Sequence, residues 1–278
     1  MLILTLLATL VPAPAGTAGQ QIVADSRTAL VTVSDARNHL TVDLGPDDFV
    51  ITERGQPREV LDAHVADYPI VILIDTGAAA RGGFDDMRKA VAHFVDRLGQ
   101  RPIALGTLTD PAGAIDDDRS AVAKRLEGLT PNDTAESAAL QAASDAARTL
   151  RTIGSRFCAI VVIAASPLDA TRAATDDVVA PIVDSGAVVH VVLQRGAPDA
   201  PTSLPMETLR RLSDQTHGQF TPIYSPASYQ AALDRLADRL ANEMIIEYIV
   251  PPQSRATDIK VGVRIPGARV HGLGVRPQ

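Results

Sequence analysis

Histidine, serine and aspartate side chains are the groups of this sequence that could carry hydrolytic or metal chemistry. The histidines to weigh are His64, His93, His190 and His217. A serine hydrolase of the elbow type needs G-x-S-x-G after a strand, and the sequence holds no such pattern. His190 stands inside an apolar β-branched run, as core histidines do, and the H-x-x-x-H and C-x-x-C metal spacings are absent. The sequence therefore predicts no catalytic residue and no enzyme; an exported hydrolase is only the third function class.

Three further observations favour structural roles or exclude particular sites. The single cysteine, Cys158, excludes an internal disulfide and a thiolate zinc site, and its apolar neighbours predict a buried thiol. The acidic run at residues 116–118 lacks the alternate spacing of an EF-hand and is interpreted as a solvated turn that caps the next helix. No G-x-x-x-x-G-K-[ST] phosphate loop occurs.

Asp75 is the carboxylate with the most informative position. It follows the continuous β-branched run at residues 70–74, which is typical of a strand buried on both faces of a parallel sheet. The Thr76-Gly77 pair after it indicates a turn. The simplest interpretation is that the Asp75 side chain accepts hydrogen bonds from backbone N–H groups of its own loop.

Charge and composition restrict the partners. The 278-residue chain has 26 basic and 33 acidic residues, a net charge of −7, and no Lys/Arg run longer than two. Nucleic-acid grooves need clustered cations, and base-stacking platforms need aromatic residues, which make up only 3% here with no Trp. We therefore expect a protein partner and no nucleic acid.

The N-terminus resembles an export signal. Residues 2–11 form an apolar run too short to span a bilayer, and Ala13-Pro14-Ala15 follows as a small-x-small cleavage pattern. A signal peptide at residues 1–19 is expected, with a frayed cytosolic N-terminus as the alternative. No later stretch reaches 18 apolar residues without charge, so the expected mature chain is periplasmic or extracellular, with no integral membrane span.

The elements that must position these residues fall into three segments. Residues 20–67 alternate in short β bursts, residues 68–242 alternate strands with helices, and residues 243–278 return to β. In the middle segment, strands are expected at 70–74, 103–108, 157–164, 187–193 and 220–224, and helices at 84–98, 120–126, 134–150, 176–184, 205–216 and 229–240. This pattern predicts a doubly wound α/β domain at 68–242, inserted into a small β domain in which 243–278 pair with 20–67.

Three passages resemble the bacterial VWFA-related domain family of exported proteins, which is similar to the von Willebrand factor type A domain. They are a leader (residues 31–35, 44–49 and 53–57), the first core strand with its Asp-Thr-Gly end (70–77), and a closing hairpin (247–252 and 259–263). The resemblance covers about residues 28–276. It implies a Rossmann-like, mostly parallel six-stranded sheet of order 3-2-1-4-5-6, whose third strand is a short antiparallel one at Ala114-Ile115.

The resemblance also implies a metal-ion-dependent adhesion site at the carboxyl ends of the strands, built from D-x-S-x-S, a Thr and an Asp. Matched residue by residue, the first carboxylate is Asp75, the two Ser positions are Gly77 and Ala79, the Thr is Thr134, and the last Asp position is Ala165. Three of the five expected oxygen donors are thus missing from the sequence.

Two interpretations of this degenerate site remain open. Asp75 and Thr134 alone would leave Mg²⁺ mostly hydrated and weakly held, which favours a non-catalytic, exported protein-interaction module without a cofactor, in which Thr134 is a helix N-cap. The alternative is a metal-dependent adhesion module with a rearranged Mg²⁺ site, in which Asp133 or Asp169 supplies a substitute carboxylate.

Overall fold

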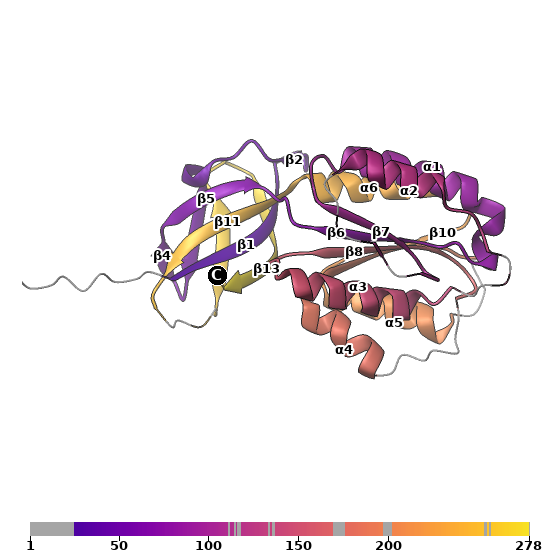
Figure 1. Ribbon diagram of the computed structural model, residues 1–278. Helices are drawn as coiled ribbons and strands as arrows, with labels where there is room; N and C mark the ends of the chain where they lie inside the picture. The colour runs from indigo at the N-terminus through magenta and orange to yellow at the C-terminus, as the bar shows by residue number, and fades with distance from the viewer. Residues whose placement is uncertain are drawn as a thin grey trace, which may run out of the picture.

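The computed structural model describes residues 25–110, 112–113, 115, 118–132, 134, 137–168, 176–196, 202–252, 255 and 257–277. These residues form two parts that lie end to end in Figure 1, one built mainly of strands and one built of helices around a sheet. We call them the β part and the α/β part.

The α/β part is built on one parallel sheet of order β10-β9-β8-β6-β7. Each residue of β6 is buried, as expected for a β-branched strand covered on both faces. The strands are β6 (Ile70–Ile74), β7 (Ile103–Thr107), β8 (Ala159–Ala165), β9 (Val188–Gln194) and β10 (Phe220–Ile223).

Six described helices cover the two faces of this sheet. Figure 1 shows α1, α2 and α6 on one face and α3, α4 and α5 on the other. Ile70, Ile72 and Ile74 belong to the first core, and Val71 and Leu73 to the second. The helices are α1 (Phe84–Arg97), α2 (Arg119–Glu127), α3 (Ala139–Ile153), α4 (Asp176–Ser185), α5 (Leu204–Gln215) and α6 (Ser228–Ala241); a 3-10 helix, η2 (Ala78–Gly83), precedes α1.

The sheet differs from the expected one at its β7 edge. The order of its five strands agrees with the expected order, but Ile115 is not in a strand and Ala114 lies outside the described residues. The sixth strand therefore stays a prediction. α3 also begins at Ala139 and not at Thr134, because the segment before it is held in a turn described below.

The β part joins strands from both ends of the chain. β1 (Asp25–Ser34) pairs with β11 (Glu243–Val250) and with β13 (Arg269–Pro277), and β5 (Val60–Val65) pairs with β11. A short β2 (Leu40–Thr41) adds to β1, and the 3-10 helix η1 (Pro46–Asp48) leads into a second sheet of β12 (Ile259–Val263), β3 (Phe49–Glu53) and β4 (Gln56–Arg58). The predicted domain bounds themselves stay predictions.

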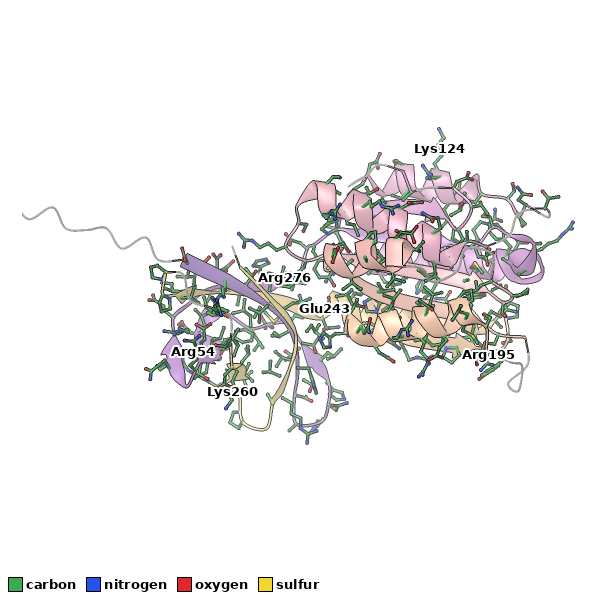
Figure 2. The ribbon with its side chains drawn as sticks, turned by 90° about the horizontal axis from the view of Figure 1, so that it is seen from below. Arg54, Lys124, Arg195, Glu243, Lys260 and Arg276 are labelled. Carbon is green, nitrogen blue, oxygen red and sulfur yellow. The ribbon has the colours of Figure 1, made fainter. Side chains whose placement is uncertain are left out.

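The two segments that link the parts run side by side. The Ala66 N–H donates to the Glu243 carbonyl at 2.8 Å, and the Tyr68 hydroxyl donates to the Glu243 carboxylate. Figure 2 shows Glu243 at this boundary. The Arg101 guanidinium lies 4.5 Å from the centre of the Tyr68 ring and donates to the Leu240 carbonyl at the end of α6. Charge and hydrogen bonds therefore hold both linkers against the α/β part.

Among the described helices, none has both the length and the apolar composition needed to cross a bilayer.

Candidate functional site

Asp75 directly follows β6, which lies between β8 and the edge strand β7, at the carboxyl-end edge of the sheet. Its N–H donates to the Ile163 carbonyl of β8 at 2.9 Å, which continues the parallel ladder by one residue. The side chain is fully buried. Open α/β sheets bind ligands at this edge, where neighbouring strands lead to opposite faces.

Three loops donate hydrogen bonds to the Asp75 carboxylate. The Gly77 N–H reaches Oδ1 at 2.8 Å, the Ser137 hydroxyl also reaches Oδ1, and the Ala165 N–H reaches Oδ2 at 2.9 Å. Gly77 comes from the loop after β6, Ser137 from the segment before α3, and Ala165 from the end of β8. We call these four residues the Asp75 cluster. One carboxylate thus joins the loop after β6, the segment before α3 and the end of β8.

Burial and hydrogen bonds act in opposite directions on the Asp75 carboxylate. Burial raises the pKa of Asp75 above its usual range, and the hydrogen bonds from Ser137, Ala165 and Gly77 counteract part of that rise. Tyr229 of α6 lies nearby and donates its hydroxyl to the Ala164 carbonyl at 2.9 Å. Burial and the neighbouring Asp75 charge raise the pKa of Tyr229, so this hydroxyl stays a neutral donor.

Thr134 is not the N-cap of α3. It is exposed, its N–H and Oγ1 both donate to the Asn132 side-chain oxygen, at 3.1 and 2.9 Å, and the residue preceding α3 is Ala138. Asn132 in turn donates its N–H to the Thr76 carbonyl. The polar run around Thr134 therefore forms an Asx turn and not a helix start.

The remaining matched positions supply no side-chain oxygen to a cation. Gly77 and Ala165 contribute N–H donors, and Ala79 is half-buried on η2. Asp133 and Asp169 lie outside the described residues. Among the described residues, the donors around the Asp75 carboxylate are N–H and O–H groups of Gly77, Ala165 and Ser137. The described residues also contain no group of three or more His, Cys, Asp or Glu side chains that could hold a metal.

Sequence reasoning missed two features of this edge. Hydroxyls of Thr76 and Thr107 both contact the Thr109 hydroxyl, at 3.2 and 3.0 Å, so they satisfy one another. The turn after β10 lies against η2, because a Cβ on Gly83 would stand 2.8 Å from the Pro226 ring. That turn exposes Tyr224 by 49%. No motif marks Ser137 or Tyr224; the one available signal for Tyr224 is an aromatic residue at the end of the predicted strand 220–224, and β10 ends one residue earlier, at Ile223.

The structure gives the surroundings of the four candidate histidines. Among the described residues, no hydrogen bond or ion pair joins two of the four histidines: His64 contacts Asp62 at 2.9 Å and His93 contacts Asp234 at 3.3 Å. His190 is fully buried in β9 with no partner on either ring nitrogen in the described structure, and burial lowers its pKa to about 3. His217 follows α5.

Two other predicted structural residues can be placed. Cys158 is buried, and burial raises the pKa of its thiol to about 11. Asp118 is the N-cap of α2, with its carboxylate accepting from the Ser120 N–H at 2.8 Å, while Asp116 and Asp117 lie outside the described residues.

Comparisons with known proteins show which fold this chain has. No protein-family model and no curated protein sequence matches the chain. Among solved structures, a von Willebrand factor type A protein from Catenulispora acidiphila is similar with a TM-score of 0.51 at 12% identity, over 91% of this chain and 73% of that chain. The pilus adhesin SpaC from Lactobacillus rhamnosus GG in its open conformation gives a TM-score of 0.49 at 10% identity, over 83% of this chain and 47% of that chain. The chain has the von Willebrand factor type A fold.

Proposed function

We propose that this chain is a non-catalytic protein-interaction module that binds its partner without a divalent cation. The observation that carries the proposal is the Asp75 cluster, in which protein donors occupy both oxygens of the carboxylate. A carboxylate offers about four lone-pair sites, and these donors take three of them, which supports a role that needs no cation. The cluster instead fixes the loops by hydrogen bonds alone.

The partner surface in this proposal is the carboxyl-end edge of the sheet. Loops on a rigid scaffold are where binding usually resides. Ala78, Pro167 and Tyr224 are exposed there, beside loops that the Asp75 cluster and the contact between Gly83 and Pro226 hold in place. Aromatic side chains are common anchors of protein interfaces, so Tyr224 is the expected anchor.

Export is a second element of the proposal. It rests on the apolar run at residues 2–11 and the Ala13-Pro14-Ala15 pattern, which lie outside the described residues. Mass spectrometry of the full-length precursor expressed in the source cells should find, in the exported fraction, a chain that begins near residue 20. An intact N-terminus in the cytosolic fraction would contradict export.

Capture from the exported fraction tests the interaction. A partner should remain bound in EDTA, and Tyr224→Ser and Ala79→Arg should each weaken its recovery. Ile153→Ser is the matched control: Ile153 is also 49% exposed, but it ends α3, before β8 begins, at the opposite edge of the sheet.

Two results would contradict the proposal. Release of the partner by EDTA with rescue by Mg²⁺ would favour the metal-dependent adhesion module. Equal effects of Tyr224→Ser and Ile153→Ser would place the partner surface away from this edge.

A further inference from the structure

A cleft of about 290 Å³ lies where the β part meets the α/β part. Both parts contribute apolar walls: Leu30 and Leu273 from β1 and β13, and Phe157, Val183 and Val188 from the other side. Small-molecule sites occur preferentially at such junctions and have volumes of about 300–1,000 Å³. The cleft is therefore at the small end of that range.

One guanidinium is built into this cleft. Arg276 of β13 lines it and donates from Nη2 to the Gly186 carbonyl of the α4–β9 turn at 3.1 Å. Gly186 has a φ of 67°, and a Cβ there would stand 2.2 Å from Nη2, so the glycine leaves the space in which the guanidinium lies. Figure 2 shows Arg276 at the boundary of the two parts.

Arg276 has no acidic partner among the described residues, although the chain carries a net charge of −7. A guanidinium has five N–H donors, and the Gly186 carbonyl takes one of them. Among the described residues that line the cleft, His217 is a further basic side chain, and none is Asp or Glu. A second cleft at the same junction is lined by Arg156 and His64 together with Asp67 and Glu247, so acidic side chains accompany its basic ones, in contrast to the cleft at Arg276.

We propose that this cleft binds a small organic anion with an apolar body, of the alkyl carboxylate class. The apolar walls bury the chain of the ligand, and the free donors of Arg276 bind its carboxylate in the planar geometry that Arg favours. At roughly 30 Å³ per water-sized unit, the cleft holds about ten non-hydrogen atoms. Octanoate matches this size and charge, and the site is independent of the carboxyl-end edge proposed for the protein partner.

Titration of the full chain with octanoate tests the proposal. We expect saturable one-site heat in isothermal titration and a melting temperature that rises with ligand concentration, because the ligand binds only the native state. Arg276→Gln should weaken binding roughly 10- to 100-fold, as for loss of a hydrogen bond to a charged group. Leu273→Trp, which fills the cleft from one wall, should abolish it.

The controls distinguish recognition of the carboxylate charge from nonspecific apolar binding. Arg269→Gln, on the exposed start of the same strand, should bind octanoate like the original chain. Octan-1-ol and octylammonium should bind at least about tenfold more weakly than octanoate. The proposal is overturned if millimolar octanoate gives no saturable heat, if the alcohol or the amine binds equally, or if Arg276→Gln and Arg269→Gln behave alike in folded protein.

Discussion

Removing the Asp75 carboxylate should destabilise the protein without any change in metal response. Asp75→Ala leaves the Gly77 and Ala165 N–H groups and the Ser137 hydroxyl without their acceptor in a fully buried place. Each buried donor left unpaired costs about 1–3 kcal/mol. The Ser137 hydroxyl can rotate to another acceptor, so the cost comes mainly from the two backbone donors. Together they cost roughly 2–6 kcal/mol of folding free energy, before the relief of the buried charge is counted.

Relief of the buried charge reduces this cost. Burial raises the pKa of Asp75, which means that its ionised form is destabilised in the native state at neutral pH. We therefore expect a net loss of about 2–4 kcal/mol at pH 7 for Asp75→Ala, and about 1–2 kcal/mol for Ser137→Ala, which removes a single donor. Urea unfolding followed by circular dichroism measures both.

The pH dependence has a defined sign. A carboxyl whose folded pKa is raised contributes stability that is fully present below its unfolded pKa and is lost as pH rises through the folded pKa. The stability difference between the original chain and Asp75→Ala should therefore widen as pH falls from 7 toward about 4. A metal-bound carboxylate has a lowered pKa and would give the opposite slope.

Either of two results would refute this reasoning: a difference that narrows on acidification, or a melting temperature that Mg²⁺ or Mn²⁺ raises in the original chain but not in Asp75→Ala. Either result would mean that Asp75 binds a cation and does not hold the loops together.

Three further predictions concern the scaffold. Gly218→Ala places a Cβ 1.8 Å from the Val189 carbonyl oxygen and should cost at least about 3 kcal/mol in urea unfolding, whereas Gly45→Ala, with nothing within 4 Å, should be nearly neutral. Burial lowers the pKa of His190 to about 3. Below about pH 6.5 the unfolded chain therefore binds a proton at His190 that the folded chain does not bind, and the free energy of unfolding falls with pH. Relative to His190→Leu, the original chain should lose about 1.4 kcal/mol of stability per pH unit in that range. Deleting residues 244–278 removes both long partners of β1 and should cause aggregation seen by light scattering; a monomeric truncation with an unchanged melt would show that β1 does not need them.

Local sequence was sufficient to predict the parallel sheet and the position of Asp75 at its edge. A β-branched run such as residues 70–74 has few stable environments other than a strand covered on both faces, and a carboxylate directly after it must reach the strand-end edge. The partners of that carboxylate were not predictable in the same way. Ser137 lies 62 residues further along the chain, and only the folded arrangement of β6 and α3 brings its hydroxyl to Oδ1.

The start of α3 illustrates a second limit. Thr134 has the residue type of an N-cap, but the same hydroxyl forms a local turn equally well when an Asn stands two residues before it. Here the Asn132 turn is present, and the helix begins at Ala139 without a side-chain cap. Short polar segments before a helix offer several competing hydrogen-bond patterns, and tertiary contacts such as the one between Asn132 and Thr76 select among them.

The pairing of β1 has a consequence for the order in which the molecule forms. Asp25 faces Val250 and Thr28 faces Arg276, so the first described strand meets its two long neighbours, β11 and β13, only after residues 243–277 have been synthesised. Contacts of such large sequence separation form slowly because a long loop must close first. The α/β part, whose parallel strands come from one continuous stretch, can condense before that closure. During synthesis β1 would therefore lack both of its long partners until those segments emerge, a period in which a chaperone that binds unfolded segments would protect it from wrong pairing.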